Sequence, residues 1–502
     1  MALLDTITHQ ETVKQHRPWP RALVNDDGWR QAIEHLAAGR CTLLALWGDG
    51  GDVHMALVAE NFGDIAVVSY ACKDGTYPSV GARHPPAIRL ERAIRDLFGL
   101  DAIDAPDTRT WLDLGFWDVR HPLGKQQPAQ KPAPYVFLPA EGEGLHQIPV
   151  GPVHAGIIEP GHFRFTANGE HVVRLEQRLG YVHKGIESLM AGAALDDAAK
   201  LAGRTSGDST VAYAFAFAQA AEAALQLTVP PRALYLRALM AEIERLANHF
   251  GDIGAICNDA SFALMHAQCA ILRERTLRAA EACFGHRLMM DAIVPGGVAR
   301  DIAADGATHV QTLLTEVRRM FPRLVELYDN TASLQDRTLT TGFVKPDFAR
   351  QFGAGGYVGR ASGRTFDARR TPGYEPYFDL KFDVSMLTAG DVNARVWIRI
   401  REVEQSLALI EQILAHLPAG PFAAAIKGNG ETGEGLGLAE AFRGDVLVAL
   451  RLDGKGRVER CHLRDASWFQ WPLLEAAIEG NIVADFPLCN KSFNCSYSGH
   501  DL

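Results

Sequence analysis

Residues 230–249 read PPRALYLRALMAEIERLANH, and this run sets the architecture of the larger part of the chain. Two prolines stand where a helix can begin, because the first helical turn does not use the backbone N–H that proline lacks. The apolar residues that follow recur mostly at spacings of three and four: Leu234, Leu236, Leu239, Met240, Ile243, Leu246 and Ala247. The run therefore predicts a long helix that buries one face.

Comparable periodicity marks other helices in the same half of the chain. It runs over 262–282, 310–327 and 396–417. Residues 209–230 are rich in alanine but contain Glu222, so they are only weakly hydrophobic for a bilayer span and predict a buried bundle helix. Residues 445–452 and 457–463, joined by the turn 453–456, predict a hairpin. The region is expected to be mainly a helix bundle with small β elements.

The first part of the chain has a different pattern. Residues 41–47 and 65–72 suit strands, and 87–98 have helical periodicity, which predicts a small α/β domain. Proline, glycine and glutamine crowd residues 121–151, where we expect the boundary. The prediction is an α+β multidomain protein. It has a small α/β domain at 1–125, a linker at 126–148 and a mainly helical domain at 149–502.

Composition narrows the class of protein. A chain of 502 residues is too long to fold around one ordinary hydrophobic core, which predicts more than one domain. The formal charge of −10 argues against nucleic acid as a partner. The first residues, MALLDTITHQETVKQ, lack a basic segment followed by an apolar one, which predicts a cytoplasmic location. The 8 cysteines form no CxxC pair and are expected to be reduced thiols.

Short motifs carry a resemblance to a known family. Residues 91–99, ERAIRDLFG, followed by 111–113 and 121–123, resemble the small peripheral-arm C subunit (30 kDa type) of respiratory complex I. Later segments resemble the D subunit of complex I, an NADH–quinone oxidoreductase, and the large subunits of group 4 NiFe-hydrogenases. These segments are 151–154, 169–170, 180–187, 231–232, 242–249, 295–298, 360–363 and 390–395. Because a C-like domain precedes a D-like domain in one chain, the closest likeness is the large subunit of formate hydrogenlyase and hydrogenase-4 complexes.

The resemblance implies an assembly and a place in the cell. Its partners would be a small iron–sulfur protein similar to the B subunit of complex I, which holds a 4Fe4S cluster, and membrane proteins similar to antiporters and to the H subunit of complex I. The chain would lie in the cytoplasm, peripheral to the inner face of the cell membrane. The resemblance also implies electron transport, proton translocation, quinone binding and NAD binding as activities of such complexes.

The loop 203–209, GRTSGDS, departs from the family where a metal would bind. In a NiFe-hydrogenase, four thiolates from an RxCGxC loop and a C-terminal DPCxxC hold the metals, since soft sulfur ligands suit nickel and iron. Those four positions fall here on two pairs of residues that carry no thiol: Ser206 and Ser209, then Ser496 and Gly499. We therefore expect no NiFe centre and no other metal bound by this chain, and a quinone is the one cofactor left open. Cys489 and Cys495 lie nearby and are either reduced thiols or an unusual ligand pair.

The quinone site of complex I is altered as well. Its tyrosine falls at Gly207 and its headgroup histidine at Ile158. His154 and His162 lie in the same segment, and either could make a shifted contact or be an ordinary hydrogen-bonded loop histidine.

Charged residues of the family cavity persist. Asp259 matches the aspartate that complex I uses near the quinone, and Glu187, in the sequence KGIE, matches the hydrogenase carboxylate that carries protons. Buried carboxyl groups of this kind can relay protons near neutral pH. They can equally form structural salt bridges with Arg204, Lys184 or Arg245. Asp208 either binds an ion, water or a small polar molecule with its loop, or fills the pocket.

Three functions are consistent with these residues. The first is a subunit without a NiFe centre that couples electron transfer from a partner cluster to proton or ion movement, using Glu187, Asp259, His154 and Arg204 around a cavity formed by Ser206, Gly207, Asp208 and Ser209. The second is a subunit that reduces a quinone at a rebuilt site. The third is a structural or regulatory subunit without redox turnover.

Overall fold

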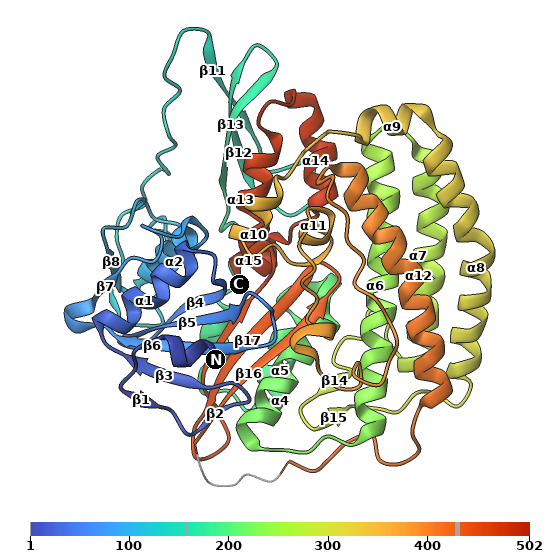
Figure 1. Ribbon diagram of the computed structural model, residues 1–502, viewed down its shortest axis with the longest axis horizontal. Coiled ribbons are helices and arrows are strands. Elements are labelled where there is room, and N and C mark those ends of the chain that lie inside the picture. Colours follow the sequence, from blue (N-terminus) through green and yellow to red (C-terminus); the bar gives the residue numbers. More distant parts are fainter. Residues whose placement is uncertain (1, 157, 427–431) are drawn as a thin grey trace.

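The computed structural model describes residues 2–156, 158–426 and 432–502. The first domain, blue in Figure 1, is built on a five-stranded sheet with the order β1-β3-β6-β5-β4. Its elements are β1 (Glu11–Thr12), β3 (Arg21–Val24), α1 (Asp26–Ala37), β4 (Cys41–Asp49), β5 (Asp52–Ala59), β6 (Ile65–Ala71) and α2 (Ile88–Phe98), with a small parallel pair, β7 (Thr76–Pro78) and β8 (Asp101–Ile103). The predicted strands and helix of this domain are confirmed.

Strand β4 stands at the edge of that sheet, yet all of its residues except the last are buried. The reason is visible in Figure 1, where the sheet of the second domain lies against this side of the first domain. A covered edge cannot pair with another chain. Two ion pairs cross this junction, one between Arg21 and Glu434 and one between Arg451 and Asp49.

The segment that follows is extended and partly irregular. It contains the short pair β9 (Val119–Arg120) and β10 (Gln127–Pro128). Three antiparallel strands come next: β11 (Leu145–Val150), β12 (His162–Asn168) and β13 (His171–Arg178). They project at the top of Figure 1. The last residues of the predicted linker, 145–148, thus belong to strand β11.

The helical part of the second domain is a bundle of long helices on the right of Figure 1. They are α6 (Pro231–Asp259), α7 (Ala263–Phe284), α8 (Gly306–Asn330) and α12 (Val392–His416), and α6 packs against both α7 and α12. Shorter elements connect them: β14 (Ile293–Val294), β15 (Gly297–Val298), α9 (Ala332–Thr338), α10 (Pro346–Gln351) and α11 (Gly356–Ala361). All four predicted long helices are confirmed.

Helix α6 buries charged residues as well as apolar ones. On the side that faces α12, His249 Nε2 lies 2.7 Å from Glu402 Oε2 and Arg399 Nε lies 3.0 Å from Asp252 Oδ2. Burial lowers the pKa of His249, whereas its contact with Glu402 opposes that shift. Because each of these charges has a partner, the polar half of the ERLANH run can be buried. A one-faced apolar helix was predicted, and the structure instead encloses α6 on most sides.

Helix α5 (Thr210–Leu225) lies against a sheet instead of inside the bundle. The sheet has the order β18-β17-β16-β2, with β2 (His16–Arg17), β16 (Gly433–Ala441), β17 (Gly444–Leu452) and β18 (Val458–Arg464). Glycines 433, 435 and 437 of β16 face the helix, and a Cβ atom on Gly435 would lie 1.8 Å from the carbonyl oxygen of Ala220. Only glycine permits this approach. The prediction of a buried helix is confirmed, and the prediction of a bundle position is corrected.

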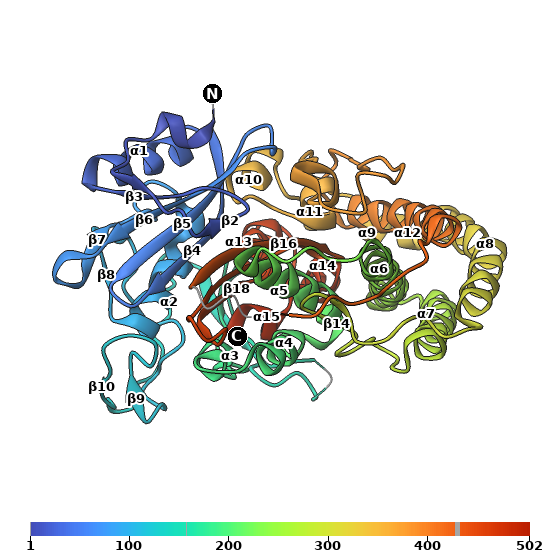
Figure 2. The same ribbon diagram turned by 90° about the horizontal axis from the view of Figure 1, so that it is seen from below.

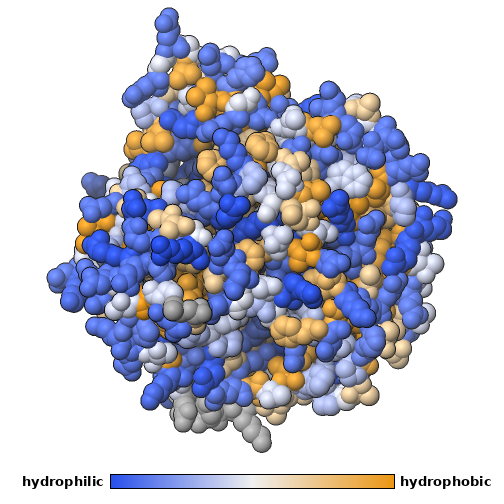
Figure 3. Space-filling model, viewed as in Figure 1, coloured by the Kyte–Doolittle hydropathy of each residue, from blue (hydrophilic) through white to orange (hydrophobic). Residues whose placement is uncertain are grey.

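The remaining elements close the molecule around this sheet. Helices α3 (Ile186–Met190) and α4 (Leu195–Gly203) lie below it in Figure 2, and α13 (Ser467–Ile478), α14 (Phe486–Phe493) and α15 (Tyr497–Asp501) complete the chain. In the described ranges, the helices are too short or too polar to cross a bilayer. Figure 3 shows hydrophobic side chains scattered among hydrophilic ones on the face seen in Figure 1.

Candidate functional site

Two segments far apart in sequence meet where the metal ligands of a NiFe-hydrogenase would lie. The loop 203–209 joins α4 to α5, and residues 494–496 join α14 to α15. Ser206 Oγ lies 3.0 Å from Ser496 Oγ, although 290 residues separate them. The backbone N–H of Gly499 donates to Ser496 Oγ at 2.9 Å. One residue from each expected ligand pair, Ser206 and Ser496, is therefore brought together with the other, and their hydroxyl groups bond to each other.

An ion pair stands beside these hydroxyl groups. Arg443, in the turn between β16 and β17, donates to both carboxylate oxygens of Asp208, at 2.8 and 2.5 Å. It also donates to Ser209 Oγ at 3.1 Å, while Ser206 Oγ donates to Asp208 at 2.8 Å. Burial raises the pKa of Asp208, but the Arg443 guanidinium outweighs it and leaves that pKa below the ordinary value. The new charge predicted in the loop is thus matched by a cation of the same chain.

This set of donors does not suit a NiFe centre. Hydroxyl groups stay protonated near neutral pH, and a guanidinium cannot ligate a metal because it has no free electron pair. Within the described residues, no group of three or more His, Cys, Asp or Glu side chains could hold a metal ion. Cys489 and Cys495 are both buried, and burial raises the pKa of each thiol, to about 11 for Cys489. The contacts fit reduced structural thiols.

Ser206, Asp208 and Ser496 form one wall of a polar cavity of about 340 Å³, which Ser209 does not line. It is lined by Ile158, Glu159, Ser206, Gly207, Asp208, Arg443, Asn490, Lys491, Asn494, Cys495, Ser496, Tyr497 and Ser498. Ile158 and Gly207, the positions expected to face a quinone headgroup, therefore lie at the same cavity, without histidine or tyrosine. A Cβ atom on Gly207 would meet no atom within 4 Å, so this wall is open.

Tyr497 brings a tyrosine to the cavity from another part of the chain. The residue is 7% exposed, and its buried hydroxyl lies beside the side chain of Asn490, another residue of the cavity wall. The ring packs edge-on against Trp471. Sequence reasoning missed Tyr497 and Arg443, because Tyr497 falls at a variable position of the C-terminal motif and Arg443 lies outside the family motifs. The nearest signal was the charge of Asp208, which needed a partner once it was buried.

The other predicted residues lie outside this cavity, as far as the chain is described. Arg204, at the end of α4, pairs with Asp291 at 2.6 Å on the surface. His154 is bonded to the carbonyl oxygen of Gly161 at 2.7 Å. His162 is likewise held in β12, beside Arg164.

Asp259 is the predicted residue with the clearest electrostatic link to the cavity. It is the last residue of α6 and is half-buried. Burial raises its pKa, and the charge of Lys491, which lines the cavity, opposes that shift. Asp252, two turns earlier on α6, reaches the cavity wall more directly, since it accepts a hydrogen bond from Asn494 at 2.8 Å.

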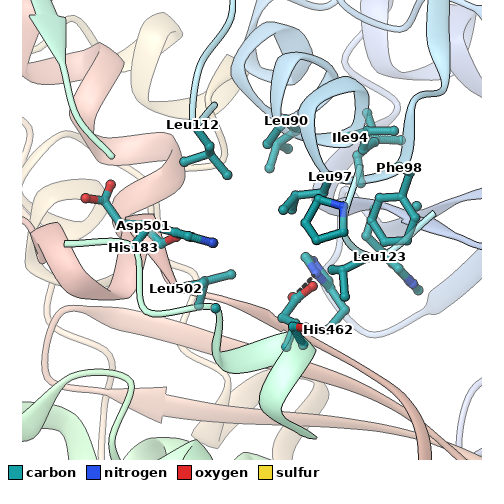
Figure 4. A pocket seen from close by; sticks show the side chains of 18 of the residues that line it. Leu90, Ile94, Leu97, Phe98, Leu112, Leu123, His183, His462, Asp501 and Leu502 are labelled. Carbon is teal, nitrogen blue, oxygen red and sulfur yellow. Dashed lines mark hydrogen bonds and ion pairs between the residues drawn. The ribbon is translucent and has the colours of Figure 1, made fainter. Parts of the chain in front are cut away.

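Glu187 lies in a different place, at the junction between the two domains. It lines a largely apolar pocket of about 50 Å³ with residues of α2, β18 and the last turn of the chain, shown in Figure 4. Its carboxylate is 2.8 Å from His462 Nδ1 and 2.9 Å from Arg460 Nη1. Burial raises the pKa of Glu187, but the charge of Arg460 and the contact with His462 outweigh it and lower this pKa to about 2. A salt bridge was one of the two predicted roles, and its partners are Arg460 and His462 instead of Arg204, Lys184 or Arg245.

Comparison with family models matches both parts of the chain. Residues 22–133 match the 30 kDa subunit of the respiratory-chain NADH dehydrogenase, and residues 261–429 and 428–501 match its 49 kDa subunit. The two domains therefore correspond to two separate subunits of that enzyme.

Individual relatives agree with these matches. Formate hydrogenlyase subunit 5 of Escherichia coli (strain K12) is 33% identical over 438 residues, which are 85% of this chain and 77% of that protein. Hydrogenase-4 component G of the same organism is 31% identical over 462 residues, 89% and 80% of the two chains. A chain of the membrane-bound sulfane sulfur reductase, an archaeal respiratory membrane complex, has a TM-score of 0.67 at 25% identity and covers 72% of this chain and 99% of its own length.

Proposed function

The chain belongs to the family of group 4 hydrogenase large subunits, with fused 30 kDa-type and 49 kDa-type domains, and on that premise we propose that it is a subunit of a membrane-associated oxidoreductase complex that works without a NiFe centre. The observation that carries the proposal is the contact between Ser206 and Ser496 beside the Arg443–Asp208 pair. Electrons would enter from a 4Fe4S cluster of a partner iron–sulfur protein. Membrane proteins would be part of the same complex, and this chain would lie peripheral to the bilayer.

Metal analysis of the native complex tests the absence of the centre. Nickel should be far below one atom per chain, while iron from the partner cluster is retained. Growth in medium rich in nickel should not change this ratio, because the ligand positions hold hydroxyl groups. One nickel atom per chain would overturn the proposal.

In this function, the polar cavity couples electron transfer to proton movement. Charged side chains at or near the cavity wall support this coupling. Asp259 is linked to the cavity through Lys491, which lines the wall and whose charge affects the pKa of Asp259. Because the pKa of Asp259 is raised by burial, that carboxyl group can take and release protons closer to neutral pH than an exposed aspartate. Glu187, whose pKa is about 2, has the contacts of a fixed structural anion instead of a relay.

Proton uptake on reduction of the complex tests the role of Asp259. We expect Asp259→Asn to take up fewer protons per electron when the complex is reduced with a viologen, and the pH dependence of uptake to flatten. The surface variant Asp305→Asn, whose side chain is 73% exposed, is the matched control. Unchanged uptake in Asp259→Asn would count against proton coupling at this residue and favour the structural or regulatory alternative.

A quinone is the second candidate for the cavity, and the place of Tyr497 in the cavity wall is the observation that favours it. The Tyr497 hydroxyl is buried, so it would bond to a quinone carbonyl oxygen after the ring turns toward the cavity, in place of the bonds that the residues at 158 and 207 can no longer make. Organic extraction of the native complex should then recover quinone, and Tyr497→Phe should lose it. If neither form yields quinone, the quinone proposal is wrong and the first proposal is the one that remains.

A further inference from the structure

Glu244 is a buried carboxyl group that no sequence motif assigned a role. It lies on α6 with 7% of its surface exposed, and its oxygens accept the backbone N–H groups of Val211 at 2.8 Å and Ala212 at 3.2 Å. These N–H groups belong to the first turn of α5, directly after the loop 203–209. No ion pair of Glu244 occurs in the described part of the chain, since the neighbouring Arg245 bonds to the carbonyl oxygens of Glu440 and Ala441 instead.

A small cavity places Glu244 between solvent and the polar cavity. Its volume is about 10 Å³, close to the space that one water molecule occupies (~10–15 Å³). Asp208 lines this small cavity and the polar cavity alike. Asn248 links the backbone at these two residues, because its side chain donates to the carbonyl oxygens of Asp208 at 2.8 Å and of Glu244 at 2.9 Å. On the other side, the wall is made by Arg273 and Arg287, which reach the protein surface.

The two acids hold protons differently. Burial, with a smaller contribution from the Asp208 charge, raises the pKa of Glu244 to about 8 against the opposing effects of the two N–H groups and Arg245. Burial also raises the pKa of Asp208, but Arg443 outweighs it and keeps this pKa low. At neutral pH, Glu244 therefore holds a proton and Asp208 is ionised. Transfer from Glu244 to Asp208 is uphill, so Asp208 carries the proton only in passing and Glu244 is the resting proton store.

We propose that Glu244 carries protons between solvent and the polar cavity, with Asp208 as its acceptor on the cavity side. In this step the O–H bond of Glu244 breaks, the proton crosses one water in the small cavity, and a new O–H bond forms on an Asp208 oxygen. The Glu244 carboxylate then takes a proton from solvent at the Arg273 side. One proton moves inward and no electron is transferred. The inference rests on the proposed function for its use in coupling, but the protonation of Glu244 itself is independent of it.

Infrared spectroscopy of the complete complex tests the protonation directly. Glu91 and Glu440 are also buried and have pKa values raised to about 7, so the test compares wild type and variant by difference. The difference between wild type and Glu244→Gln at pH 7 should contain the carbonyl band of a protonated carboxyl group, and this band should fade as the pH rises through about 8. In Glu244→Asp the band should shift in position instead of disappearing. Glu187→Gln is the matched control, because Glu187 is buried but ionised, so its difference from wild type should contain no such band. A difference between wild type and Glu244→Gln without this band would overturn the proposal.

Proton uptake on viologen reduction tests the transfer. We expect Glu244→Gln to slow it by about 10²-fold, the scale of one lost acid–base group, with Glu244→Asp restoring much of the rate. If Glu244 had only a structural role, Glu244→Gln would change the stability of the protein, and Glu244→Asp would not restore the rate of proton uptake. Uptake at the wild-type rate in Glu244→Gln would overturn the proposal even if the band were lost. Nickel in the protein would defeat the proposed function and leave the infrared result standing.

Discussion

Asp208 and Arg443 depend on each other more than the loop sequence reveals. The Arg443 side chain is 5% exposed, whereas Asp208 keeps 36% of its side-chain surface open toward the cavity. Removing the charge of Asp208 leaves a buried guanidinium without its anion. We expect Asp208→Asn to lower the free energy of unfolding by about 3 kcal/mol, measured by denaturant titration of the purified protein.

The control for this prediction is the Arg204–Asp291 pair, in which both side chains are 40% exposed. Because water screens this pair, Asp291→Asn should cost less than about 1 kcal/mol. Equal losses in the two variants would contradict the assignment of Arg443 and Asp208 as a buried ion pair in which each charge needs the other.

Glu187 predicts a pH dependence whose sign follows from its contacts. Its pKa falls from 4.5 in the unfolded chain to about 2 in the folded one, which corresponds to on the order of 3 kcal/mol. A depressed carboxyl pKa stabilises the fold above the unfolded value, so this contribution is complete above about pH 5 and is lost between about pH 4.5 and pH 2. Stability measured against pH should therefore fall less steeply in this range in Glu187→Gln. Identical slopes in the two proteins would mean that Arg460 and His462 do not hold the carboxylate.

At the site, sequence reasoning reached some residues and missed others for a physical reason. The meeting of Ser206 and Ser496 was implied by the family motifs, and the structure joins them. Arg443 lies 235 residues from Asp208, and an ion pair at that separation has no spacing signal in one sequence. Glu244 was visible only as a polar residue of the ERLANH helix, because its protonation depends on burial that the sequence does not display.

At the scale of elements, the long helices were predictable and several strands, β16 among them, were not. Helices α6, α7, α8 and α12 repeat apolar residues over many turns, which gives a strong periodic signal. Strand β16 reads GEGLGLAEA, and glycine is depleted in strands, so no strand was predicted there. Its glycines are explained by the helix that crosses them, a tertiary contact that local pattern does not contain.

Gly435 provides a test of that contact. A Cβ atom at this position would lie 1.8 Å from the Ala220 carbonyl oxygen, which belongs to the backbone and can move only if α5 shifts. We expect Gly435→Ala to destabilise the protein by roughly 3 kcal/mol, at the upper end of overpacking costs. Thermal unfolding of the purified chain would measure it. Gly51→Ala is the control, since a Cβ atom there meets nothing within 4 Å, and a loss as large as that of Gly435→Ala would refute the close packing of α5 on β16.

At the scale of the whole molecule, the two domains share one apolar core across their junction. The same cluster of buried residues contains Leu90 and Trp111 of the first domain with Trp471 and Phe486 of the second. The pocket in Figure 4 lies at this junction, with the α2 side chains on one side and Leu502 on the other. Matching of the two parts to separate subunits of NADH dehydrogenase is consistent with such an interface, since subunits that bind permanently resemble a core cut in two.

Because of this junction, we expect the two domains to stay bound to each other after the linker between them is cut. A protease site placed at residues 130–134, an extended and largely exposed segment, would separate the first domain from the second covalently. We expect both fragments to elute together in gel filtration and to separate only in denaturant, because apolar burial and the pairs Arg21–Glu434 and Arg451–Asp49 hold them. Leu90→Asp, at a position 3% exposed, places a charge in the junction and should release the fragments after the same cut. Wild-type fragments that separate without denaturant would show that the covalent linker, and not the shared core, joins the domains.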